Sequence, residues 1–373
     1  MLLTLGVVGA ALLALTWVVY PAAIILAGNV ARWLRTPDVD VPDAALPTVT
    51  VVVATRDAPD LVGARVLDIL ASSYPAHLLD VIVAVDARAE LIDPESLVLP
   101  ARARAVRGDD PGGKCPTLNA GVRAATGAVV AFTDTHQRFD ALAMRRMVSA
   151  LITRGYGATS GRLLLPRDKE SSLVRRYTQY ELYIRDGEAQ LHSAVGVSGS
   201  VFAMWRALWS PLPAGLILDD LFTPMRLVLA GHRIGFQRDA FAYEKRLVVP
   251  SQEYRRKVRT LTGNLQLCAW LPGVLVPIRN PIWLQFVCHK LLRLVTPYAV
   301  ALVGVAVAGE IATHLGDRLP LGLGIAAVAS VWGALSGDVV ARRLRSLVIQ
   351  AASLQAAVVT ATGNAIRGRW DVW

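Results

Sequence analysis

Cysteine is scarce in this sequence. Only three occur among 373 residues, at Cys115, Cys268 and Cys288. The chain contains no CxxC pair and no cluster of His and Cys, and it shows no internal repeat or low-complexity tract. This argues against a disulfide framework and against a structural zinc site, and it favours a reducing compartment.

Charge is missing from the amino-terminal end, where no charged residue precedes Arg32. The uncharged run is longer than the ~20 apolar residues that span hydrocarbon. A cleaved signal peptide would have a basic start and a short apolar core, and this segment has neither. We therefore predict a retained transmembrane helix over residues 1–31. The basic segment "ARWLRT" follows at once, so the positive-inside rule places this end in the cytosol.

The whole chain is both apolar and basic. Hydrophobic residues make up 54%, mean hydropathy is +0.43 and the formal net charge is +10, which is too apolar for an ordinary soluble enzyme. Excess Lys and Arg is compatible with nucleic acid, anionic lipid or a phosphorylated substrate. The apolar content favours the last two, so membrane lipids are expected partners and nucleic acid is not.

The carboxy-terminal third is apolar again, and we predict a transmembrane region over residues 286–373, preceded by interfacial amphipathic helices over 247–285. One span is expected from Leu294 to Ala312 and a short second span from Pro320 to Leu335. The last apolar run, from Leu347 to Ile366, contains polar residues; it could span the membrane or lie in its interface.

The middle of the chain, residues 43–246, has the composition of a soluble domain. The segments "TVTVVVATRD", "DVIVAVD" and "AVVAFTD" predict buried strands that end near Asp57, Asp86 and Asp134. Between the first two, "LVGARVLDILASSYP" predicts an amphipathic helix stopped by Pro75. Strand and helix alternate at this spacing, which indicates an α/β fold with a doubly wound parallel sheet. Ligands of such sheets bind beyond the carboxyl ends of the strands.

Asp134 and His136 form a candidate metal site. They lie two residues apart after a strand, so an extended chain would place both side chains on one side. A carboxylate and an imidazole can hold a divalent cation, with phosphate oxygens completing its shell. The alternative is a solvated turn at the end of a strand.

The segment "DDPGGKCPTLNAG" is a candidate phosphate-binding loop. Gly112 and Gly113 allow the backbone to approach a ligand closely, and Lys114 supplies a point charge that suits phosphate. The spacing of a Walker A loop is absent. A flexible glycine loop with an exposed lysine is the alternative.

Two adjacent carboxylates, Asp219 and Asp220, interrupt the apolar run "GLILDDLFTPMRL". Acidic groups in the first turn of a helix are favourable by ~0.3–1 kcal/mol each, which accounts for one of them. A general base in a dry pocket beside a second carboxylate accounts for both.

A basic cluster lies just before the chain turns apolar, in "SQEYRRKVRT". Its charged residues could meet anionic lipid headgroups. They could equally clamp a diphosphate leaving group. The two interpretations are compatible if they concern different faces of one helix.

The order of these features resembles the membrane-integrated family 2 glycosyltransferases, the group that contains cellulose, chitin and hyaluronan synthases and ceramide glucosyltransferase. No single motif carries the resemblance, which covers nearly the whole chain. Its segments, in order, are "YP" in the first apolar run, "VTVVVATRD", "SSYP", "DVIVAVD", "GGKCPTLNAG", "AFTD", "GVSGS", "LDD", "AFAYEK", "RKVRTLTGNLQ" and "CHKLLRLVTPY".

The resemblance implies a GT-A-type nucleotide-sugar-binding domain on the cytosolic face of the membrane. By position, Thr55 and Asp57 would lie near the nucleotide, and Asp86 would contact the uridine. Lys114 would lie near the diphosphate. Asp134 would be the first member of the metal-binding DxD motif, with Mg²⁺ or Mn²⁺ as the cofactor.

The same resemblance makes Asp220 the catalytic base, and Asp219 stands where the motif often has Glu. The chain departs from the family in two places. His136 replaces the second carboxylate of DxD, which makes the cation site less negative. The usual QxxRW is replaced by "RKVRT", in which Arg256 and Arg259 occupy the Gln and Arg positions and Thr260 the Trp position.

Arg256, Arg259 and the downstream Gln266 are expected to bind substrate. In the polymerising synthases the missing Trp packs against the acceptor sugar, where aromatic stacking holds it, so its loss argues against processive addition.

These observations favour an inverting glycosyltransferase that moves a sugar from a UDP-sugar to a lipid-linked or membrane-embedded acceptor. The protein would be integral to the plasma (inner) membrane, with its catalytic domain in the cytoplasm. One alternative is a processive synthase of a secreted exopolysaccharide, with a saccharide acceptor. Another is a degenerate, non-catalytic membrane subunit.

Overall fold

The computed structural model of the protein describes residues 1–36, 40–164, 172–244, 250–315 and 339–371. The predicted span from Pro320 to Leu335 lies outside these residues. The chain divides into two compact units, a sheet-containing unit and a helical unit. The sheet unit comprises Ala23–Val248 and Gln266–Phe286, and the helical unit comprises Met1–Ala22, Val249–Leu265 and Val287–Trp373.

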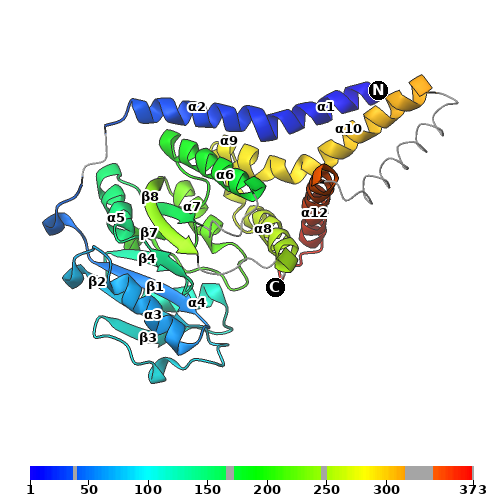
Figure 1. The fold of residues 1–373 in the computed structure, drawn as a ribbon. Helices are drawn as coiled ribbons and strands as arrows, with labels where there is room; N and C mark the ends of the chain where they lie inside the picture. The colour runs from blue at the N-terminus through cyan, green and yellow to red at the C-terminus, as the bar shows by residue number, and fades with distance from the viewer. Residues whose placement is uncertain (37–39, 165–171, 245–249, 316–338, 372–373) are drawn as a thin grey trace. The chain divides into compact units, whose positions relative to one another are not determined.

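The sheet unit is built on one eight-stranded sheet, with strand order β3-β2-β1-β4-β7-β6-β8-β5 (Figure 1). Its strands are β1 (Val49–Thr55), β2 (Leu79–Val85), β3 (Ala103–Arg107), β4 (Val129–Thr133), β5 (Gln137–Phe139), β6 (Ala158–Leu164), β7 (Phe202–Trp205) and β8 (Ile234–Glu244).

The first four strands are mutually parallel. Three of them, β1, β2 and β4, are the runs that the sequence predicts, because valine-rich runs buried on both faces suit a parallel sheet. Strand β3 was not predicted; it is only partly buried and pairs with β2 alone. Val53 on β1 faces both Val83 on β2 and Thr133 on β4, so the carboxyl ends of these strands reach one edge. The rest of the sheet is mixed, so the sheet as a whole is mostly parallel. Strand β7 runs antiparallel to both β4 and β6, and β5 runs antiparallel to β8.

Helices cover both faces of the parallel half. Helices α3 (Pro59–Leu70) and α5 (Ala143–Arg154) pack into the core formed by the odd-numbered valines of β1 and β2. Helix α4 (Lys114–Ala124) packs on the other face, where a Cβ on Gly121 would lie 2.5 Å from Val52 Cγ1. The unit also contains α6 (Ser172–Leu191), α7 (Asp219–Leu229) and the short α9 (Trp283–Phe286).

Helix α3 ends at Leu70, earlier than the expected stop at Pro75. Ser73 N–H donates to Ala141 O at 2.9 Å. The serines before the proline therefore form a turn that is bonded elsewhere in the fold, and they do not extend the helix.

The helical unit contains most of the apolar helices. Helix α1 (Leu2–Ala14) runs through a π-turn, Leu15–Val19, into α2 (Tyr20–Trp33), which belongs to the sheet unit from Ala23 onward. After α9, a second π-turn, Val287–Leu291, leads into α10 (Leu292–Leu315). Helices α8 (Pro250–Trp270) and α12 (Val339–Ile366) complete the described part.

Two continuous helices, Leu2–Trp33 and Trp283–His314, are long and apolar enough to cross a membrane. The first half of one lies along the second half of the other (Figure 1), and Trp17 Nε1 donates to Thr296 Oγ1 at 3.2 Å. The expected boundaries after residue 31 and between residues 285 and 286 both fall inside these helices.

Candidate functional site

Polar side chains follow three adjacent parallel strands at one edge of the sheet. Thr55 ends β1, Asp86 follows β2 directly and Asp134 follows β4 directly. Because these strands run parallel and in register, the three residues lie at the same edge. This is the edge at which ligands of doubly wound sheets bind.

Asp86 holds the glycine loop in front of α4. It is 4% exposed, and its Oδ1 accepts hydrogen bonds from Gly113 N–H at 2.9 Å and from Arg88 N–H at 3.0 Å. The guanidinium groups of Arg56 and Arg88 lie 3.8 and 3.7 Å from its carboxylate oxygens. Neither arginine was singled out from the sequence, which has no spacing signal for them.

Lys114, the first residue of α4, forms an ion pair with Asp219, the first residue of α7. The distance from Nζ to Oδ2 is 3.0 Å. Burial alone would lower the pKa of Lys114, but Asp219, Asp134 and Asp220 together outweigh it and raise that pKa above its ordinary value. The loop lysine and three of the predicted carboxylates therefore share one electrostatic environment.

The two adjacent carboxylates differ in their surroundings. Asp219 is 5% exposed and paired with Lys114, whereas Asp220 is half-buried. Gly199, in the small-residue segment before β7, lies against both charges: a Cβ on it would be 3.3 Å from Asp220 Cβ and 3.4 Å from Lys114 Nζ. A hydrogen at this position keeps the space beside Asp220 open.

Asp57 organises a second group of predicted residues. Its own N–H donates to Thr55 Oγ1 at 2.9 Å, and its carboxylate accepts a hydrogen bond from Thr135 Oγ1. His136 Nε2 lies 3.5 Å from Asp57 Oδ1. The segment from Asp134 to His136 is a turn and not the extended chain we expected, because β4 ends at Thr133 and β5 leaves to pair with β8.

The donor set for a metal ion is small. Among the described residues no group of three or more His, Cys, Asp and Glu side chains could hold one. Asp134 supplies a carboxylate beside the phosphate-suited Lys114, and the ring of His136 has a second nitrogen besides the one directed at Asp57. One carboxylate and one imidazole fit a cation such as Mn²⁺ that takes its remaining ligands from a bound diphosphate and water.

A buried arginine lies under the Asp134 turn. Arg65 on α3 is fully buried, donates to Thr133 Oγ1 at 2.8 Å and pairs with Asp68, and its guanidinium lies 4.4 Å from the Phe139 ring centroid. Burial lowers its pKa to about 10, despite the opposing effects of Asp68 and Asp134. The sequence did not indicate that Arg65, on the core face of α3, would support the turn that carries Asp134.

The residues of the "RKVRT" region are divided between the units. Arg256 and Arg259 lie on the part of α8 that belongs to the helical unit, where Arg256 is exposed and Arg259 is half-buried. Gln266 belongs to the sheet unit and is fully buried. Its Oε1 accepts from Ile217 N–H at 2.8 Å and its Nε2 donates to Gly215 O at 3.0 Å. Its amide therefore binds protein backbone, which differs from the substrate contact we expected.

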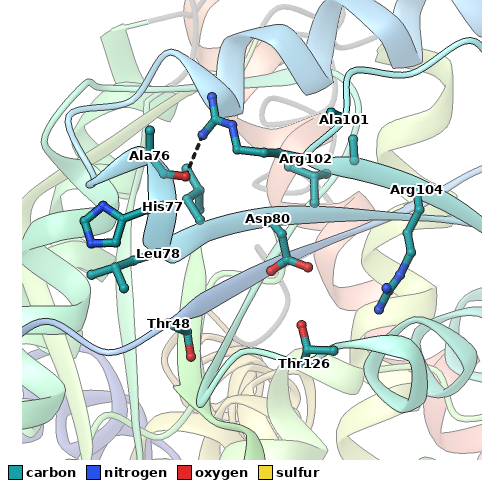
Figure 2. A pocket seen from close by; sticks show the side chains of 12 residues that line it. Thr48, Ala76, His77, Leu78, Asp80, Ala101, Arg102, Arg104 and Thr126 are labelled. Atoms are coloured by element: carbon teal, nitrogen blue, oxygen red, sulfur yellow. Dashed lines mark hydrogen bonds between the residues drawn. The ribbon is translucent and has the colours of Figure 1, made fainter.

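A cavity of about 600 Å³ lies at the opposite end of β1, β2 and β3, where these strands begin (Figure 2). Its wall includes Asp80, which accepts a hydrogen bond from Thr50 Oγ1 at 2.6 Å, and Arg102, which donates to Ala76 O at 3.0 Å. No predicted site residue lines it. The chemistry-bearing side chains gather at the other edge.

Comparison with known proteins identifies the family and the fold of the chain. The family model described as "Glycosyltransferase like family 2" matches residues 47–263, which is more than half of the chain. A search of curated proteins found no match. Among solved structures, the chain is similar to mannosyltransferase PcManGT from Pyrobaculum calidifontis in complex with GDP-Man and Mn²⁺, with TM-score 0.64 and 22% identity. The alignment covers 97% of this chain and 99% of that one, and at this identity it establishes the fold alone.

Proposed function

Because the chain belongs to the glycosyltransferase-like family 2, whose members transfer a sugar from a nucleotide sugar, we propose that it is an inverting enzyme with Asp220 as the base. The donor is a UDP-sugar, and the acceptor is a lipid-linked or membrane-embedded molecule. One observation carries the proposal: of two adjacent carboxylates, Asp219 is neutralised by Lys114 and Asp220 lies half-buried beside it.

The reaction needs one proton acceptor and stabilisation of one leaving group. The acceptor hydroxyl attacks the anomeric carbon, forming a new C–O bond as the bond from that carbon to the diphosphate breaks. Asp220 takes the hydroxyl proton, a contribution that is typically worth ~10²–10⁴-fold. The reaction is a single displacement, so the anomeric configuration inverts.

The leaving diphosphate would be held at the amino end of α4. Lys114 supplies a full positive charge there, and the first N–H groups of the helix add a partial one. Asp134 and His136 would hold Mg²⁺ or Mn²⁺, which neutralises diphosphate charge when bound. Thr55, Asp57 and Asp86 line the strand ends that would receive the nucleoside.

The membrane context rests on the two long apolar helices. We propose an amino-terminal transmembrane helix (1–31), a cytosolic catalytic domain (43–246), interfacial helices (247–285) and a carboxy-terminal membrane region (286–373). The basic segment after the first helix supports the cytosolic side by the positive-inside rule. An acceptor embedded in the same membrane would meet the catalytic domain at this surface.

The proposal is tested by replacing Asp220 with Asn. Membranes containing the wild-type chain would be screened with radiolabelled UDP- and GDP-sugars, GDP-mannose included because PcManGT binds it. Asp220→Asn is expected to bind the donor as the wild type does in calorimetry and to lose transfer by ~10²-fold or more.

Asp43→Asn is the matched control, since Asp43 is an exposed carboxylate that precedes the start of β1 and pairs with Arg145 on α5. It should leave transfer unchanged. Comparable turnover by Asp220→Asn and wild type would refute Asp220 as the base. A wild-type chain that binds and transfers none of the nucleotide sugars would refute the function itself.

A further inference from the structure

The start of α7 carries both candidate catalytic carboxylates, but no side chain caps it. Leu218 occupies the N-cap position and makes no side-chain hydrogen bond to the helix. The place of Asp219 and Asp220 is therefore set by the loop that leads into the helix, together with Val197 N–H, which donates to Asp220 O at 2.9 Å. That loop turns at Gly215, whose φ of +77° is strained for other residues.

Each residue of the loop from Gly215 to Ile217 is held by a buried side chain. The Gln266 amide makes hydrogen bonds to the first and the last of these residues: it donates to Gly215 O and accepts from Ile217 N–H. Cys115 Sγ lies 3.6 Å from the carbonyl oxygen of the middle residue, Leu216. Cys115 directly follows Lys114 on α4, so the loop is fastened beside the lysine that pairs with Asp219.

We propose that Gln266 is a positioning residue, which sets the location of the Asp219–Asp220 pair through the Gly215–Ile217 loop. The inference rests on the proposed function, because it assigns Gln266 a part in that reaction. An amide is the side chain that fits, since one of its polar atoms must accept and the other must donate. Gln266 and Ile217 are both fully buried, so loss of the bond to Ile217 N–H leaves a backbone group unsatisfied in the core, whereas Gly215 is exposed.

The variant Gln266→Glu tests the positioning role, because it should make kcat depend on pH in a way that a change in packing alone would not. The ionised carboxyl group still accepts from Ile217 N–H but turns a second acceptor toward Gly215 O. Once protonated, the same group donates there and restores both bonds. Burial raises the pKa of a carboxyl group, so this change falls within an accessible pH range.

The experiment measures kcat and KM of full-length wild type and Gln266→Glu between about pH 5 and about pH 9. The ratio of variant kcat to wild-type kcat at each pH removes the pH dependence that the two proteins share. We expect this ratio to rise roughly tenfold as the pH falls, while donor affinity stays at the wild-type value. Gln266→Met, which can neither donate nor accept through an amide, should show a ratio that is low by up to ~10²-fold and independent of pH.

Gln285→Glu is the matched control. Gln285 is a buried glutamine of the same unit, and its amide donates to Glu188 O at 3.3 Å, away from α7. Its kcat ratio should not vary with pH. A flat ratio for Gln266→Glu, or a loss confined to donor affinity, would overturn the positioning role.

If neither Gln266 variant folds, amide hydrogen exchange on the wild type tests whether Gln266 holds the loop. The Ile217 amide should exchange as slowly as the amides inside α7, because Gln266 holds it in the core. Exchange as fast as in exposed loops would overturn the inference. This measurement needs no transfer activity, so it also separates a failure of the inference from a failure of the proposed function.

Discussion

Lys114 is the residue on which the charge of the candidate site depends. Its side chain is 30% exposed, and it faces carboxylates from two different elements, α7 and the turn after β4. Burial would favour the neutral amine, but the three carboxylates overcome it, so the pKa of Lys114 is raised and the ammonium persists into alkaline solution. A diphosphate arriving here meets a fixed positive charge.

Asp219→Asn should therefore change the pH dependence of nucleoside diphosphate binding. Removing the strongest raising partner lowers the pKa of Lys114. Affinity that needs the ammonium is lost as the pH rises through that pKa, so the loss comes at lower pH in the variant. Calorimetric titrations with UDP from about pH 7 to about pH 10 would show this. An Asp219→Asn profile parallel to the wild type would contradict it.

The raised pKa of Lys114 also makes its contribution to the free energy of unfolding depend on pH. Its folded-state pKa is raised, so its stabilising contribution is complete below the unfolded pKa of ~10.4. That contribution is lost as the pH rises through the higher folded-state pKa.

Among the elements, the entry to α4 shows how the backbone creates the site. Gly112 and Gly113 have φ values of +78° and +99°, which turn Gly113 N–H toward Asp86 and bring Lys114 to the first position of the helix. The guanidinium of Arg88 lies where a side chain on Gly113 would go: a Cβ there would be 2.6 Å from Arg88 Nη2. The backbone shape therefore requires glycine, whereas the exposed Arg88 side chain could move aside.

Two glycine substitutions of identical chemistry should have opposite effects. Gly113→Ala places a side chain at φ 99° and ψ 171°, a region adopted essentially by glycine alone, and should lower the free energy of unfolding by about 1–3 kcal/mol. Gly63→Ala, inside α3 with nothing within 4 Å of the new Cβ, should raise it by about 0.5–1 kcal/mol. Urea denaturation of both variants measures these changes, and equal effects would contradict the conformational argument.

For the molecule as a whole, the charged end of the first apolar helix is held within the sheet unit. Arg32, the first charge after the apolar run, forms an ion pair with Asp186 on α6, which also pairs with Arg238. Gly28 and Gly187 bring α2 and α6 into backbone contact within the same unit. The helix proposed to enter the membrane is therefore continuous with the catalytic fold.

If the two long apolar helices enter the membrane, the attachment of the protein to membranes should resist salt. The full-length chain should sediment with membranes in ~1 M salt, which screens charges beyond about 3 Å, and it should be released only by detergent. Val8→Arg puts a charge on an exposed face of α1, which costs ~2.5–3.5 kcal/mol in a bilayer centre. It should reduce the sedimenting fraction, with Val8→Leu as the neutral control. Release of the wild type by salt alone would contradict insertion.

The sequence by itself determined the local features of this protein. Runs such as "VTVVVAT" predict buried parallel strands, and Asp86 and Asp134 follow them directly, so one edge of the sheet had to become polar. The adjacent Asp219 and Asp220 were recognisable for a similar reason, because two charges inside an apolar run are costly unless they are used. Side-chain period and strand ends are properties of neighbouring residues, and the sequence displays them.

Only the tertiary structure decided which of these groups meet. It brought Lys114 to Asp219, turned β7 antiparallel to β4, and engaged Gln266 with the loop before α7. It also placed the buried Arg65 under the Asp134 turn. Each depends on segments that are distant in the chain, because a buried charge or amide is stable only beside a partner that the whole fold delivers.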